Sequence, residues 1–151
     1  METKSETVDT IRRPIRGPQA PPMKQIKPVG LTSGRQITSS PTAVVYCEGN
    51  FAQIDGKTAN GLVRHSQAYR ILSVIDSTCS CQDSGTVLDD VSNNIPIFGH
   101  LDAAVAHEAA LPDTLIYGMA PSTGRLSIAD RGVVLQAIEL GMNIVSGLHE
   151  Y

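Results

Sequence analysis

The pattern of hydrophobic and polar positions along this chain changes near residue 41. Beyond that point, five short apolar runs alternate with stretches in which apolar residues recur three and four positions apart. Short apolar runs are typical of strands buried on both faces, and the wider spacing is typical of helices. The predicted strands are Ala43–Cys47, Arg70–Asp76, Ile95–Phe98, Asp113–Gly118 and Asn143–Ser146.

Three main helices are predicted between these strands, at Lys57–Ser66, at Leu101–Leu111 and from Ser127 to Leu140. Ser127 and Asp130 fit a capping box, in which a hydroxyl and a carboxylate satisfy the first free amides of a helix. Gly141 supplies the stop of the same helix. The polar segment Ser77–Asn94 is predicted to be a loop with room for one short helix.

This alternation predicts an α/β fold of Rossmann-like, three-layer type with a mainly parallel, five-stranded sheet. Right-handed crossovers give the strand order 3-2-1-4-5, and Pro96 in the third strand favours an edge position. Ligands of such sheets bind where the strand order reverses, between strands 1 and 4. The candidate site is therefore placed in the loops Glu48–Lys57, Asp76–Gly85 and Met119–Arg125.

The last predicted strand is followed by only a few residues, so no further element of the sequence covers its edge. An unprotected apolar edge invites pairing with another chain. We therefore predict a homo-oligomer, formed by edge pairing, helix packing or exchange of the N-terminal segment.

Residues 1–40 have a different composition from the rest of the chain. They hold five of the nine prolines, no aromatic residue, seven Lys or Arg and three acids. Such a segment cannot bury enough apolar surface to offset its ordering entropy, so a flexible or extended basic arm is predicted before a domain at 41–151. That domain has five basic and twelve acidic residues. Its acidity favours an arm that lies on the same or a neighbouring subunit over one that binds nucleic acid.

Some classes of protein are disfavoured by the sequence. No apolar run approaches the roughly 20 residues that span a bilayer. The N-terminus lacks the apolar core of a secretory signal, and its acids count against a transit peptide. An odd, low count of three cysteines does not suggest a disulfide framework. We expect a cytoplasmic protein with no membrane partner.

Candidate cofactor-binding residues lie after the first and second predicted strands. Gly56, Lys57 and Thr58 suggest a P-loop, but six residues separate Gly49 from Gly56 where the motif requires four. Lys57 and Thr58 at a helix N-terminus can still hold an anion. No Gly-x-Gly-x-x-Gly occurs, which disfavours a standard dinucleotide site. Asp76 stands where a ribose-binding acid is found in such folds, although acids at strand ends are common.

Other candidates lie further along the chain. In the loop after the fourth strand, Ser122, Thr123 and Gly124 allow close backbone approach, and Arg125 suits a phosphate or carboxylate; the alternative is a plain crossover loop. Cys79 and Cys81 are two ligands where a closed zinc site needs four, so free thiols and no metal are expected. Cys47 is placed in the core. His149 and Glu150 form a candidate acid/base pair with no visible third partner.

Several stretches resemble the N-terminal Rossmann-like domain of the domain-of-unknown-function 1611 family, over roughly residues 42–151. The most specific is the run from Gly141 to Glu150; the others are Gly56–Ala59 with Gly61–Arg64, Val74–Asp76, Ile95–Ile97 and Gly118–Pro121. Members of that family usually continue into a C-terminal P-loop domain, and some are linked to N-acetylation of D-glutamate with acetyl-CoA. The sequence stops where that domain would begin. The resemblance thus implies the fold, and the loops Gly56–Ala59 and Gly118–Arg125 as ligand or interdomain surfaces.

The layout from Ile95 to Glu150 is also similar to CoA-binding domains of succinyl-CoA-ligase type, which makes CoA or acetyl-CoA the first ligand to test. Our first hypothesis is a stand-alone, self-associating module with a structural or assembly role. The alternative is a subunit that binds CoA or a nucleotide and works with a separate P-loop protein in D-glutamate or acyl-group metabolism. A third hypothesis is an acyltransferase using His149 and Glu150. Whether the chain is an enzyme is left open, with a non-catalytic role favoured.

Overall fold

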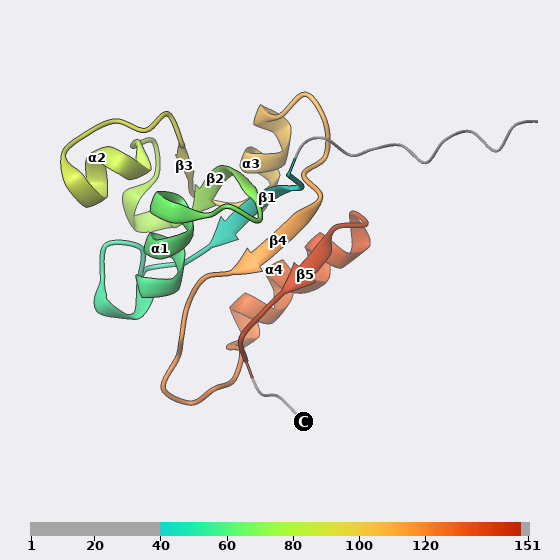
Figure 1. Ribbon diagram of the computed structural model, residues 1–151. Helices are drawn as coiled ribbons and strands as arrows, with labels where there is room; N and C mark the ends of the chain where they lie inside the picture. Colours follow the sequence, from blue (N-terminus) through green and yellow to red (C-terminus); the bar gives the residue numbers. More distant parts are fainter. Residues whose placement is uncertain (1–39, 149–151) are drawn as a thin grey trace, which may run out of the picture. The chain divides into compact units, whose positions relative to one another are not determined.

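The computed structural model describes residues 40–148. The predicted arm, apart from Ser40, and the pair His149 and Glu150 lie outside these residues. The described part contains a five-stranded sheet in which every pairing is parallel (Figure 1). Its order, β3-β2-β1-β4-β5, confirms the prediction. The strands are β1 (Thr42–Tyr46), β2 (Arg70–Ile75), β3 (Ile97–Phe98), β4 (Thr114–Tyr117) and β5 (Asn143–Val145).

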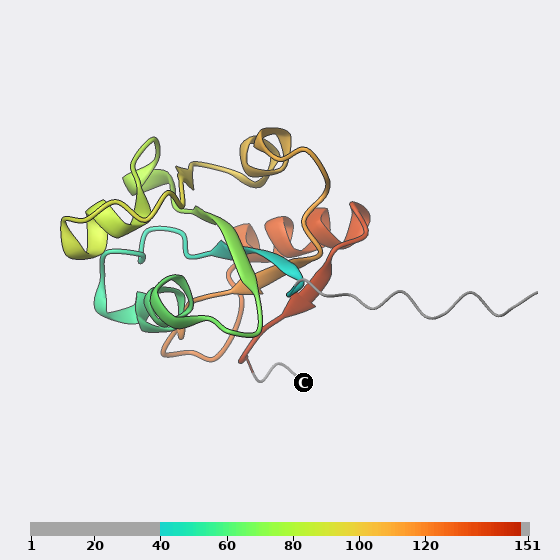
Figure 2. The same cartoon turned by 45° about the horizontal axis from the view of Figure 1, so that its top comes forward.

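Helices cover both faces of this sheet. They are α1 (Lys57–His65), α2 (Ser84–Asp89), α3 (Leu101–His107) and α4 (Ile128–Glu139), with short 3-10 turns η1 (Ile54–Gly56) and η2 (Ser77–Cys79). α1 and α2 lie on one face, where Arg64 and Asp89 form an ion pair of 2.6 Å, and α3 and α4 lie on the other (Figure 2). None of the helices within residues 40–148 is long and apolar enough to cross a membrane.

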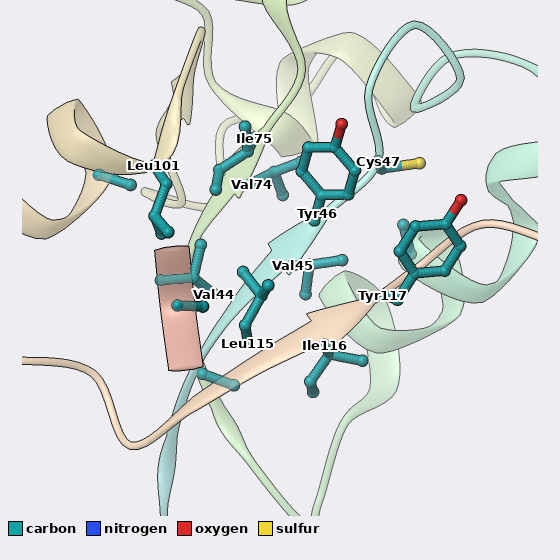
Figure 3. Packing of buried hydrophobic residues seen from close by; sticks show 14 of the residues in the cluster. Val44, Val45, Tyr46, Cys47, Val74, Ile75, Leu101, Leu115, Ile116 and Tyr117 are labelled. Carbon is teal, nitrogen blue, oxygen red and sulfur yellow. The ribbon is translucent and has the colours of Figure 1, made fainter. Parts of the chain in front are cut away.

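The central strands β1 and β4 carry the core. Their apolar side chains are buried on both sides because each face of the sheet has its own helix layer (Figure 3). This is why both strands have continuous apolar runs rather than alternating ones. Phe51, in the loop after β1, is fully buried and extends the core to the carboxyl ends of the strands.

The two edges of the sheet are protected differently. Beside β3, the segment 81–84 runs antiparallel: Cys81 N–H donates to the Ile97 carbonyl, and Ile97 N–H donates to the Gln82 carbonyl, both at 2.9 Å. Pro96 fits this edge because its missing N–H is not needed, while its carbonyl accepts from Val74 N–H at 3.0 Å. On the outer side of β5, no strand of the described residues is paired.

Two elements are shorter than predicted by more than one residue at one end, and the ends of the other predicted elements agree to within one residue. α3 ends at His107 rather than Leu111, because Glu108 adopts an extended backbone and the chain turns back toward the buried Pro112 and β4. Pro112 disfavours helical geometry at the residue before it, so Leu111 is a poor position for the end of α3. β3 is two residues long instead of four.

The ends of α4 are as predicted. The Ser127 hydroxyl accepts from Asp130 N–H at 3.1 Å, and the Asp130 carboxylate accepts from Ser127 N–H at 3.2 Å. Gly141, with φ of 87°, donates to the Ile138 carbonyl, and Met142 donates to the Ala137 carbonyl. This pair of bonds is a Schellman motif, which requires the left-handed conformation that glycine adopts without strain.

Candidate functional site

A polar cleft of about 270 Å³ lies at the carboxyl ends of β1 and β4, where the strand order reverses. This is the position at which open α/β sheets bind ligands. Three segments build the cleft: the loop after β1 with η1, the end of β4 with its loop, and the first turn of α4. The lining residues are Glu48, Asn50, Asp55, Tyr117, Met119, Pro121, Ser127 and Asp130.

Asp130 connects the helix and the two central strands. Its carboxylate accepts from the Tyr46 hydroxyl at 2.8 Å and from the Tyr117 hydroxyl at 3.1 Å, besides capping α4. The two tyrosines are the last residues of β1 and β4, and their ring centroids are 5.9 Å apart. Figure 3 shows both hydroxyls at the same end of the strands. One carboxylate therefore fixes the position of α4 over the switch point.

The protonation of this cluster follows from these contacts. Burial raises the pKa of Tyr46, and the hydrogen bond to Asp130 raises it further, because losing the proton would put two negative charges together. Burial alone would also raise the pKa of Asp130, but hydrogen bonds from Ser127, Tyr46 and Tyr117 outweigh it and lower that pKa. Tyr46 is therefore a neutral donor and Asp130 an ionised acceptor near neutral pH.

The opposite wall of the cleft is held by Glu48 and Asn50. The Glu48 carboxylate accepts from Ser77 N–H at 2.9 Å and from the Ser77 hydroxyl, which ties the β1 loop to the β2 loop. The Asn50 amide donates to the Glu48 carbonyl at 2.7 Å and to the Met119 sulfur at 3.2 Å. With Asp55 and Asp130, the lining carries three carboxylates, and none of the residues that line this cleft is basic.

Lys57 and Thr58, predicted to hold an anion, are exposed in the first turn of α1 and are not among the residues that line the cleft. η1 leads directly into α1, and the Ala59 N–H donates to the Gly118 carbonyl at 3.1 Å. That N–H is therefore not available to an anion. Neither residue is brought to the carboxylate-lined cleft.

The loop after β4 contributes Pro121 to the cleft, whereas the predicted residues Ser122, Thr123, Gly124 and Arg125 are not part of its lining. They form a turn: Gly124 N–H donates to the Pro121 carbonyl at 2.9 Å, and Gly124 has a φ of 67°. The Arg125 side chain is exposed. Within the predicted loop Met119–Arg125, the residues that line the cleft are Met119 and Pro121. Ligand binding by Ser122, Thr123, Gly124 and Arg125 stays a prediction.

Asp76, predicted as a ribose-binding acid, is fully buried at the end of β2. Its carboxylate accepts from Phe51 N–H at 2.9 Å, from Thr78 N–H at 2.8 Å and from the Thr78 hydroxyl at 2.6 Å. These bonds fold the β1 loop and η2 onto the strand ends. The carboxylate has no exposed surface in this geometry and serves to hold the two loops together. Ribose binding by Asp76 stays a prediction.

The three cysteines are free thiols, and Cys47 is in the core as predicted. Burial, with a smaller contribution from Asp76, raises the pKa of Cys47 to about 12, so it stays a thiol. Cys81 borders a second, mainly apolar hollow of about 390 Å³ between β3 and α3, where the Phe98 and His107 rings lie 5.1 Å apart. Within residues 40–148, no group of three or more His, Cys, Asp or Glu is arranged to hold a metal ion.

The strand order, the two helix layers and the cleft at the switch point define a Rossmann-like α/β domain. Residues 77–151 match the family model of DUF1611_N, a Rossmann-like domain of unknown function. The resemblance read from the sequence is therefore confirmed. No curated protein matches the chain.

A solved structure extends this relation beyond the family match. The crystal structure of a DUF1611 family protein from Anabaena variabilis superimposes with a TM-score of 0.65 and 27% sequence identity. The match covers 74% of this chain and 30% of the Anabaena chain. The chain thus spans less than a third of that protein, and the comparison concerns its Rossmann-like part.

Proposed function

We propose that this domain is a self-associating assembly module and that the outer face of α4 is its contact surface. The observation that carries the proposal is that α4 is apolar on both sides. Ala137 is buried against the sheet, while Ile128, Leu135 and Ile138 on the opposite side are 95%, 50% and 52% exposed. Clustered exposed apolar residues mark contact surfaces.

The neighbourhood of α4 supports this proposal. The helix leads into β5, whose outer side is unpaired among the described residues and whose Val145 is 38% exposed. By contrast, the segment 81–84 covers the edge at β3. Of the eight large apolar residues that are exposed within residues 40–148, five lie in α4, at its end or in β5. Such clustering is expected of an interface rather than of scattered single residues.

Replacing Leu135 with aspartate tests the proposal. At concentrations of about 10 µM, we expect the wild-type chain to sediment as a dimer or larger species and Leu135→Asp as a monomer, since a buried charge without a partner costs several kcal/mol. Leu135 is half exposed in the single chain, so the variant should fold. The matched control is Ile54→Asp, at an apolar residue 72% exposed in η1, which should leave assembly unchanged. A monomeric wild type would overturn the proposal.

A second candidate function, small-molecule binding at the switch-point cleft, is favoured by the position of the cleft and its convergent polar groups. Its three carboxylates suit a ligand that donates hydrogen bonds or carries an ammonium group, and they disfavour the phosphates of CoA. This revises the expected ligand class. The role would still be that of a binding subunit working with a separate catalytic protein.

Calorimetry with acetyl-CoA, ATP, NAD and a simple diamine tests the second candidate. We expect no heat from the three phosphate-bearing molecules, because the cleft would repel them, and unchanged traces for Lys57→Ala and Arg125→Ala. If the diamine binds in the cleft, Asp55→Asn should weaken its binding about tenfold by removing one partner of an ammonium group. If acetyl-CoA binds and Lys57→Ala or Arg125→Ala abolishes its binding, the ammonium ligand is rejected. CoA bound by Lys57 and Arg125, as expected from the sequence, would then be the better assignment.

A further inference from the structure

We infer that two copies of this chain pair through α4, with the two helices antiparallel and a two-fold axis passing at Leu135. This inference rests on the proposed function and adds the partner surface and its register. The outer face of α4 is formed by exposed residues only. Successive helical residues are rotated by about 100°, which places six positions within an arc of about 120°. All six are exposed: Ile128, Arg131, Gly132, Leu135, Ile138 and Glu139.

Gly132 is the first feature of this face that the single chain does not explain. It lies in the middle of α4, where glycine is the least favourable residue apart from proline. Its φ is not in the left-handed region, and a Cβ built on it would meet nothing within 4 Å. A single copy therefore has room for a side chain here. A glycine at such a position lets another backbone or a large side chain approach closely.

Arg131 and Glu139 are the second feature. Within residues 40–148, neither side chain forms an ion pair, whereas Arg64 and Asp89 pair with each other. The two are eight residues apart on α4, a rise of about 12 Å, so they do not reach each other in one copy. They flank Leu135 at equal distances of four residues on either side.

An antiparallel pairing about Leu135 uses both features at once. It places Leu135 against Leu135 of the second copy, Ile138 over Gly132 and Arg131 opposite Glu139. Because a two-fold interface is isologous, each of the last two contacts forms twice. The large side chain of Ile138 packs on Gly132, which has no side chain, and each Arg131 pairs with a Glu139 of opposite charge.

This self-complementarity is the reason to assign a second copy as the occupant. An unrelated partner would not require opposite charges at symmetric positions around a central leucine. Pairing through the edge of β5 is a weaker alternative, since β5 has only three residues and offers few backbone groups to another strand. The helix face supplies both apolar area and register.

Charge reversal tests the register. In the full chain, we expect Arg131→Glu and Glu139→Arg each to raise the dimer Kd about tenfold, because each creates two like-charge contacts per dimer. The double variant restores the opposite pairs, so its Kd should return to within about threefold of wild type. Sedimentation equilibrium measures each Kd. If the Kd of the double variant is raised by both single effects combined, the proposed pairing of Arg131 with Glu139 is wrong.

Gly132→Leu is the second test, and folding does not limit it. The added side chain points into open space in the single chain, so thermal stability should be kept or raised. In the pair it would collide with Ile138, and we expect the dimer Kd to rise at least about a hundredfold. Gly61→Leu is the matched control, since Gly61 is an exposed glycine of α1 that also has nothing within 4 Å. It should leave the Kd unchanged.

The outcomes separate this inference from the proposed function. If Leu135→Asp dissociates the wild-type assembly but Gly132→Leu does not weaken it, the face is used in another register or by another partner surface, and only the inference falls. If the wild-type chain is monomeric, both fall. Loss of assembly in Gly132→Leu together with rescue by the double charge reversal supports both.

Discussion

Replacing Asp76 with asparagine is expected to destabilise the domain by about 3 kcal/mol, and to lower its melting temperature by roughly 15 °C. The fully buried carboxylate holds two loops: one oxygen accepts from Phe51 N–H, and the other accepts from the backbone and side chain of Thr78. Asparagine keeps the shape but replaces one oxygen with an NH₂ group. In either orientation of the side chain, that NH₂ group would face an N–H donor. The buried N–H of Phe51 or that of Thr78 would then lose its acceptor.

The same substitution should remove part of the acid sensitivity of the fold. Burial alone would raise the pKa of Asp76, but the bonds from Thr78, Phe51 and Gly49 lower it below its ordinary value of 3.8. A group whose pKa is lower in the folded state stabilises the fold above its unfolded pKa and loses that contribution as the pH falls through the folded pKa. The difference between wild type and Asp76→Asn is therefore largest near neutral pH and shrinks below about pH 4.

Urea unfolding at several pH values measures this difference. Asp55→Asn is the matched control, because the Asp55 side chain is an exposed acid of the neighbouring η1 turn. We expect it to change the free energy of unfolding by less than about 0.5 kcal/mol at any pH. A neutral effect of Asp76→Asn would contradict the structural role and reopen the possibility that this carboxylate faces a ligand.

The sequence predicted the sheet and its order because the determining signals are local or follow from general rules. Continuous apolar runs identified the central strands, and the handedness of crossovers set their order. Both ends of α4 were also readable. Ser127 with Asp130 and Gly141 are signals that act within one turn of the residues that carry them.

The composition of the cleft was not predictable in the same way. Asp130 was assigned only to the helix cap, although it also accepts from Tyr46, which is 84 residues away. That contact depends on where α4 comes to lie over the sheet. One signal in the sequence would have helped: the two strands at the switch point, β1 and β4, both end in tyrosine, whose hydroxyl can reach past the last pleat.

The environment of Asp76 and the outer face of α4 were missed for a related reason. An acid at a strand end can be exposed or covered, and it is the fold of the loop at Phe51 that covers this one. Likewise, α4 carries apolar residues on both sides, so its sequence does not indicate which side packs on the sheet. Only the assembled domain shows that Ile128 and Ile138 are the ones left exposed.

Gly118→Val is expected to destabilise the domain by about 3 kcal/mol, because this glycine lies in close contact with Ala59 of α1 and Val45 of β1. A Cβ at position 118 would lie 2.7 Å from Val45 Cγ1 and 2.8 Å from Ala59 Cβ, closer than carbon atoms can pack. The Gly118 carbonyl also accepts from Ala59 N–H at 3.1 Å, so α1 cannot move away without losing that bond. Chemical denaturation of the variant gives the measurement.

Two variants decide whether this close approach is the cause. Gly61→Ala, in the same helix but with open space around the added methyl group, should stabilise the domain by about 0.5 to 1 kcal/mol. Ala59→Gly removes one of the two clashing atoms, so combining it with Gly118→Ala should cost less than the sum of the single changes by about 1 kcal/mol. Strict additivity would mean that the two residues do not compete for the same space. The position of α1 on the sheet would then depend on other contacts. That position also places η1, whose Asp55 lines the cleft.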